Sequence, residues 1–146
     1  MSPEAGAHTR RLRVDHDGAD RFRIGVRGHT MSVDQTVADG GDDSGPTPTE
    51  LFVAGLASCV AFYVRRFLAR HELPALGLAV TADFDMTAHP ARVGEVRLQI
   101  HLPTELSPPR QAALLAVAAH CTVHNTLLQP PAVAIALAAP AVPSPA

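Results

Sequence analysis

The hydrophobic pattern of the chain is most continuous between Leu51 and Val64, where no charged residue interrupts it on any face of a helix. A helix that is apolar all round must be buried in a core, at an interface or in a membrane. This run spans only about 21 Å at ~1.5 Å per residue, which is short of the roughly 30 Å hydrocarbon core of a bilayer. We therefore expect burial within protein and no association with a membrane.

Polar residues mark both ends of this helix. Thr47, Pro48 and Glu50 combine a Thr-x-x-Glu capping box with a proline at the first helical position. Basic residues at the other end suit the C-terminal end of the helix dipole, namely Arg65, Arg66, Arg70 and His71. The pattern predicts a helix that begins near Pro48 and ends before Pro74.

Short segments rich in β-branched and aromatic residues precede the helix, at 10–15, 21–26 and 30–33. Asp17-Gly18 and a glycine at position 28 separate them, which predicts a small antiparallel meander. The stretch 35–45 then has the composition of an exposed loop. Its aspartates lack the spacing and the closing glutamate of an EF-hand, so we expect no calcium site.

Apolar and polar residues alternate along 76–87 and again along 93–102, with a turn at Ala88-His89-Pro90 between them. Alternation with a period of two is typical of half-buried strands. Two such strands joined by a short turn predict a β-hairpin.

A second helix is predicted from Ser107-Pro108 to Cys121, because apolar residues recur there at helical spacing. A further turn or short helix is expected at 122–129, and 132–137 is expected to add a last edge strand. The resulting order βββ-α-ββ-α-β, with helices against one sheet, describes an α+β fold.

At 146 residues the chain is long enough for one domain with a hydrophobic core and too short for two domains that each have one. We expect a flexible arm at 1–9, a single domain at 10–138 and a disordered tail rich in proline and alanine at 139–146. A monomer of this size has too few residues to cover the helix at 51–64 on every side. We therefore expect a homodimer that buries this helix.

The net charge and the N-terminal residues limit which binding partners and which cellular compartment we expect. A formal net charge of −2 gives no general attraction to nucleic acid, and no basic patch with interleaved aromatics is present. The N-terminal residues contain no apolar run of signal-peptide length, which favours the cytoplasm.

The candidate chemistry lies in the only two cysteines, Cys59 on the long helix and Cys121 at the end of the second helix. They can be inert buried residues, a redox pair or, with His120 and His124, ligands of a zinc ion. The spacing matches no standard zinc pattern, so we expect no metal and no cofactor. Small residues around Gly55 allow close approach of another backbone over Cys59.

A reactive cysteine needs an activating neighbour, because a thiol with a pKa of about 8.5 is largely protonated at neutral pH. The helix dipole cannot act on Cys59, since its influence fades within roughly the first turn and Cys59 lies several turns beyond Pro48. A cation must therefore come from elsewhere in the fold or from a second subunit.

Three stretches carry a resemblance to a known family: PTPTELFVAGLASC, the later HCTVHNTL and, upstream of both, RGHTMSVDQ. Together with the hairpin between them, they resemble the OsmC/Ohr family of thiol-dependent hydroperoxide reductases from about Arg21 to Leu137. The resemblance implies an intertwined homodimer with the long central helix buried in it. It also implies that Cys59 is the peroxidatic cysteine and Cys121 the resolving cysteine.

The same resemblance implies organic or lipid hydroperoxides as substrates, in oxidative-stress defence, and a lipoylated protein or thioredoxin-like dithiol donor as reductant. The alternatives are a non-catalytic OsmC-like protein that binds small apolar ligands, and a thiol redox sensor. Stoichiometric oxidation without recycling would favour either alternative over an enzyme.

The sequence departs from the efficient peroxidases of that family at two points. Thr49 stands where those proteins have a glutamate, and Glu50 lies half a helical turn out of phase with Cys59. We therefore interpret Glu50 first as a helix cap and keep it as a candidate for the catalytic carboxylate. No arginine lies between Gly28 and Thr49. The candidates for the activating cation are therefore Arg21, Arg23 and Arg27, of which we select Arg27.

Overall fold

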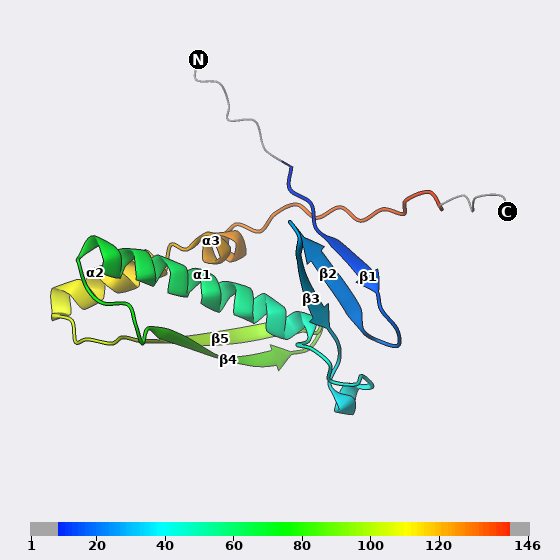
Figure 1. Ribbon diagram of the computed structural model, residues 1–146, viewed down its shortest axis with the longest axis horizontal. Helices are drawn as coiled ribbons and strands as arrows, with labels where there is room; N and C mark the ends of the chain where they lie inside the picture. The colour runs from blue at the N-terminus through cyan, green and yellow to red at the C-terminus, as the bar shows by residue number, and fades with distance from the viewer. Residues whose placement is uncertain (1–8, 141–146) are drawn as a thin grey trace, which may run out of the picture.

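The computed structural model describes residues 9–140 (Figure 1). In chain order its elements are β1 (Arg13–His16), β2 (Phe22–Val26), β3 (His29–Val33), the short 3-10 helix η1 (Val37–Asp39), α1 (Pro48–Arg70), β4 (Ala79–Thr87), β5 (Arg92–His101), α2 (Pro108–Ala118) and α3 (Thr122–Leu128). The α+β class, the N-terminal meander, the long helix and the hairpin are confirmed. The expected arm and tail lie almost wholly outside the described residues.

The long helix α1 begins where its capping box predicts. The Glu50 backbone N–H donates to Thr47 Oγ1 at 3.2 Å, and the Thr47 N–H donates to Glu50 Oε1 at 2.9 Å. This reciprocal pair satisfies two backbone donors that have no partner within the helix. The helix ends at Arg70, before Pro74 as expected.

The five strands form two separate sheets rather than the single sheet that the sequence suggested. The antiparallel β1-β2-β3 sheet pairs Phe22 with Val33, and the antiparallel β4-β5 hairpin is a sheet of its own. In Figure 1 the hairpin runs along the length of α1, whereas the three-stranded sheet lies at the N-terminal end of that helix. Because the two sheets lie at different places along α1, no hydrogen-bonded ladder joins β3 to β4.

One face of α1 forms the core. Its buried side chains are Val53, Leu56, Val60, Val64, Phe67 and Leu68. The hairpin and α2 pack on this face, with Leu106, Leu114 and Cys121 completing the buried cluster. The opposite face stays open within one chain, where Phe52 is 45% and Phe62 57% exposed. Full burial of the helix is therefore not achieved by a single chain.

Among the described residues, α1 is the one helix long and apolar enough to cross a membrane, with a mean hydropathy of 1.6. The core helix of a soluble protein passes the same test. One face of α1 packs against the hairpin and α2, and 33% of the apolar window is buried.

The expected last strand at 132–137 is wrong. Residues 122–128 form α3, the short helix that the sequence suggested, and 129–140 have no secondary structure. Residues 132–137 contain no proline, but no strand of the described chain pairs with them, so they have no ladder to join. Val133, Ile135 and Leu137 are consequently 78%, 94% and 101% exposed.

Candidate cysteine site

Cys59 lies in the middle of α1, half-buried at the border of the hydrophobic cluster. Gly55, one turn earlier on the same face, has no atom within 4 Å of the position that a side chain would occupy. Within a single chain, no other segment packs closely over this position. The thiol lies between the closed and the open face of the helix.

Cys121 does not end α2, as the sequence suggested, but begins α3. Helix α2 stops at Ala118, and Cys121 is the N-cap residue of α3, where its Sγ accepts a hydrogen bond from the His124 N–H at 3.3 Å. The residue is fully buried. Burial raises the pKa of the Cys121 thiol, and the backbone N–H of His124 opposes this shift.

The fold brings the two cysteines together although they lie far apart in the sequence. Cys59 packs against the buried cluster that contains Cys121, and its proximity raises the pKa of Cys121 further. Both thiols are free. The arrangement has the components of a dithiol–disulfide couple, with one accessible and one buried sulfur.

A hydrogen bond that the sequence did not predict lies beside the cysteines. The Tyr63 hydroxyl and Thr122 Oγ1 are 2.9 Å apart. Tyr63 is one turn after Cys59 on α1, and Thr122 comes directly after Cys121. The four-residue spacing between Cys59 and Tyr63 is visible in the sequence. The pairing of Tyr63 with Thr122 is not, because it depends on how α3 packs against α1.

The histidines near Cys121 have local roles. His120 Nδ1 donates to the Ala116 carbonyl oxygen at 2.7 Å, and His124 supplies its backbone N–H to Cys121. Within residues 9–140, no three histidine, cysteine or acidic side chains are grouped so as to hold a metal ion.

Neither charged candidate is hydrogen-bonded to a cysteine within residues 9–140. Glu50 serves the capping box of α1. Arg27 is exposed at the turn between β2 and β3, where it lines a cavity with Arg10, Arg11, Leu12 and Val26. Arg21 donates to the Asp17 carbonyl at 2.8 Å within the preceding turn. No arginine among residues 9–140 hydrogen-bonds to Cys59 or Cys121.

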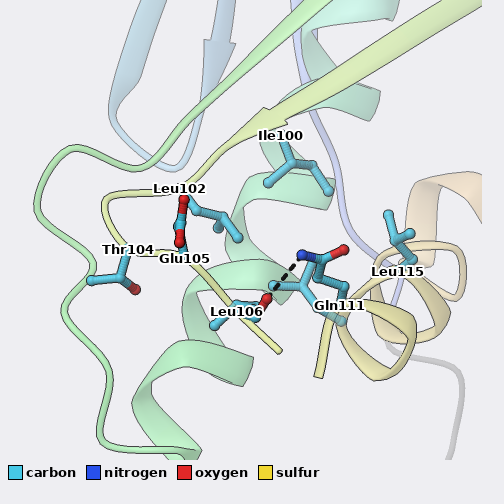
Figure 2. Close-up of a pocket in the computed structure, with 8 residues that line it drawn as sticks. Ile100, Leu102, Thr104, Glu105, Leu106, Gln111 and Leu115 are labelled. Atoms are coloured by element: carbon cyan, nitrogen blue, oxygen red, sulfur yellow. Dashed lines mark hydrogen bonds between the residues drawn. The ribbon is translucent and has the colours of Figure 1, made fainter. Parts of the chain in front are cut away.

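The cavity drawn in Figure 2 is separate from the cysteines. It has a volume of about 490 Å³ and lies between the end of β5, the loop after it and α2. Gln111 Nε2 donates to the Leu106 carbonyl oxygen at 2.9 Å across it, and the buried Thr104 Oγ1 has no hydrogen-bond partner within the described chain. Because no cysteine lines this cavity, it contributes no group to thiol chemistry.

Comparison with known proteins agrees with this architecture. Residues 41–136 match the family model described as OsmC-like protein. That segment begins before α1 and extends past α3, so it contains both cysteines. No curated protein is significantly similar to the chain.

Solved structures with the same fold come from several bacteria. A protein from Psychrobacter arcticus, described as an osmotic stress induced and detoxification response protein, is 25% identical with a TM-score of 0.75, over 79% of this chain and 85% of that one. An organic hydroperoxide resistance protein from Legionella pneumophila is 22% identical with a TM-score of 0.64, over 83% and 90%. A Vibrio cholerae protein with captopril in one of its active sites is 16% identical with a TM-score of 0.62, over 85% and 88%.

Proposed function

Because the chain belongs to the OsmC-like family, we propose that it is a thiol-dependent peroxidase that reduces organic hydroperoxides, with Cys59 as the attacking residue and Cys121 as the resolving residue. The observation that carries the proposal is that Cys59 packs against the buried cluster that contains Cys121, where its proximity raises the pKa of the Cys121 thiol. Two cysteines placed by different helices, one half-buried and one fully buried, suit two different steps of one reaction.

In the first step the Cys59 thiolate attacks the distal oxygen of the hydroperoxide. The O–O bond breaks, the alkoxide takes a proton and leaves as an alcohol, and Cys59 becomes a sulfenic acid. In the second step the Cys121 sulfur attacks the Cys59 sulfur, a disulfide forms and water leaves. A dithiol donor then reduces the disulfide and is itself oxidised to a disulfide, which returns both thiols.

The environment of Cys121 supports this division of roles. Burial raises the pKa of Cys121, which favours its protonated form and suits a residue that acts only after Cys59 is oxidised. Its Sγ is held by the first turn of α3, where backbone N–H groups stabilise the thiolate once a sulfenic acid is present to attack.

The proposal includes a homodimer. Large apolar side chains are exposed on the N-terminal sheet and on the open face of α1, among them Val14, Met31, Phe52 and Phe62. An obligate dimer interface of 2,000 Å² or more, by a rough general figure, would cover these side chains.

The proposed dimer also provides a source for the cation that would activate Cys59. Arg27 is exposed at a turn of the sheet that such an interface would reorganise, and no acidic partner is found for it among residues 9–140. A guanidinium delivered by the second subunit would favour the Cys59 thiolate by charge.

A single-turnover experiment tests the pair directly. Reduced protein mixed with one equivalent of cumene hydroperoxide should lose two free thiols and contain one Cys59–Cys121 disulfide by mass spectrometry. The Cys121→Ser variant should instead yield a sulfenic acid at Cys59 that a dimedone reagent traps. Oxidation of Cys121 while Cys59 stays reduced would reject the assignment.

A second function, as a binding protein or redox sensor, is favoured by one observation. Thr49 replaces the glutamate of the efficient peroxidases, and within the described chain neither cysteine contacts an arginine. A protein of that kind would be oxidised once and would not be recycled by a dithiol donor.

A further inference from the structure

The cavity drawn in Figure 2 combines aliphatic walls with a small number of polar groups. Its volume is about 490 Å³, and its apolar lining consists of Ile100, Leu102, Leu106, Leu114 and Leu115. Leu106 and Leu114 belong to the buried cluster, so part of the wall is the hydrophobic core itself. Concave apolar cavities of this size with few polar groups are typical of sites that bind small molecules.

The polar part of the lining carries an unneutralised negative charge. It consists of a hydroxyl, a carboxylate and an amide, from Thr104, Glu105 and Gln111. None of the described residues that line the cavity is basic. The ion pairs found among residues 9–140 do not include Glu105. A ligand with a positive charge would therefore supply the partner that the described chain does not.

Gln111 presents a hydrogen-bond acceptor as well. Its Nε2 donates to the Leu106 carbonyl oxygen at 2.9 Å, which fixes the orientation of the amide. Figure 2 shows that its Oε1 points away from Leu106, and no donor among residues 9–140 hydrogen-bonds to this oxygen. A ligand with N–H groups would satisfy Oε1, whereas a ligand that only accepts hydrogen bonds would not.

Thr104 supplies an independent sign of a missing partner. Among the described residues, its Oγ1 is the one buried side-chain polar atom without a hydrogen bond. Buried polar groups are nearly always hydrogen-bonded, because an unpaired buried hydroxyl costs free energy of folding. Since Thr104 also lines the cavity, a polar group of a bound ligand is the available partner for this hydroxyl.

The cavity lies outside the surfaces that the proposed dimer covers. Its walls come from the end of β5, the loop after it and α2, which pack on the buried face of α1. The proposed dimer instead covers the N-terminal sheet and the open face of the same helix. Leu115 is 59% exposed where it lines the cavity, so the cavity is open to solvent on that side.

We propose that this cavity binds a small primary amine with an aliphatic chain, in its ammonium form. The ammonium group combines a positive charge with three N–H donors, which match the Glu105 carboxylate and Gln111 Oε1. The aliphatic chain lies against the leucine side chains and leaves water. A carboxylate of the same length would be repelled by Glu105. No cysteine lines the cavity, so the inference does not depend on the proposed peroxidase function.

Titrations of the reduced, full-length protein test this site. Hexylamine, butylamine, hexanol and hexanoate are added to wild type, Glu105→Gln and Glu72→Gln, and the backbone amide signals are followed by two-dimensional NMR. Glu72 is the matched control, because it is an exposed glutamate that also has no ion pair among the described residues and does not line the cavity. The spectra themselves verify that all three proteins are folded.

We expect hexylamine to shift signals within 100–115 and to bind more tightly than hexanol and hexanoate. Glu105→Gln should bind hexylamine about three- to fivefold more weakly, from the loss of one partly exposed charge pair, and hexanol as wild type does. Glu72→Gln should match wild type. Butylamine should bind wild type about tenfold more weakly than hexylamine, because less apolar surface is buried.

Three results would overturn the proposal: hexanoate binding as tight as that of hexylamine, unchanged hexylamine affinity in Glu105→Gln, or signal shifts confined to other parts of the chain. Thr104→Val adds a separate check, since it keeps the shape of the side chain and removes the unpaired hydroxyl. Without ligand this variant should melt no lower than wild type, and hexylamine should raise its melting temperature less. Equal increases in melting temperature would contradict a ligand contact at Thr104.

Discussion

The Tyr63 hydroxyl lies 2.9 Å from Thr122 Oγ1, and this hydrogen bond joins the helix that carries Cys59 to the residue next to Cys121. Cys121 is the N-cap of α3, so the position of Thr122 sets where the buried sulfur lies relative to α1. The contact therefore orients the two cysteines even though neither takes part in it.

Removal of this hydrogen bond should slow disulfide formation. We predict that Tyr63→Phe and Thr122→Val each lower the free energy of unfolding by about 1 kcal/mol and slow the appearance of the disulfide after one equivalent of hydroperoxide. Stopped-flow thiol titration and urea unfolding measure the two effects. Because both changes remove the same bond, the double variant should resemble either single one, and fully additive effects would contradict the assignment.

Glu50 should affect stability and leave the chemistry unchanged. Its carboxylate accepts from the Thr47 N–H in the capping box, so Glu50→Ala should destabilise the protein by about 1 kcal/mol, whereas Glu50→Gln should be close to wild type. Hydroperoxide turnover by folded Glu50→Gln should be unchanged. A large loss of turnover in that stable variant would instead place Glu50 in the active site.

Arg27 should control the ionisation of Cys59 in the dimer. We predict that Arg27→Ala moves the alkylation of Cys59 by iodoacetamide to higher pH, because a nearby cation favours the thiolate. Arg23→Ala is the matched control, since Arg23 is an exposed arginine of the same strand region. An alkylation profile that shifts for Arg23→Ala and not for Arg27→Ala would transfer the role to Arg23.

Asp34 should stabilise the loop that leads into α1 at all but the lowest pH. Hydrogen bonds from the Ser44 hydroxyl and backbone N–H, joined by those of Gln35 and Asp42, lower the pKa of this buried carboxyl to about 2. A carboxyl with a lowered pKa in the folded state stabilises the fold above its ordinary value of 3.8, and this contribution is lost as the pH falls towards 2.

The corresponding test compares thermal melts of wild type, Asp34→Asn and the exposed neighbour Asp43→Asn. The melts are recorded between about pH 2 and pH 7, a range that includes both the lowered and the ordinary pKa of an aspartate. Asp34→Asn should melt lower at neutral pH and lose less stability on acidification than the other two. Parallel curves for all three proteins would show that Asp34 is not the responsible group.

The sequence was sufficient where structure depends on neighbours along the chain. The capping box at Thr47, the alternation along β4 and β5 and the proline that opens α2 each specify a local conformation, and each element lies where they predict. The spacing of the two cysteine motifs also indicated the family that the comparisons establish.

It was insufficient where structure depends on what lies across the fold. A last strand at 132–137 needed an edge to pair with, and none of the described strands pairs with it in a single chain. The Tyr63–Thr122 contact joins residues 59 positions apart, which no local pattern specifies.

The most direct test is steady-state consumption of an alkyl hydroperoxide and of hydrogen peroxide by dimeric, reduced protein with a dithiol donor, beside the Cys59→Ser variant. We predict turnover that favours the alkyl substrate and disappears in Cys59→Ser. Absence of turnover in folded wild type, or equal turnover in the variant, would contradict the peroxidase assignment and leave the binding or sensing function in its place.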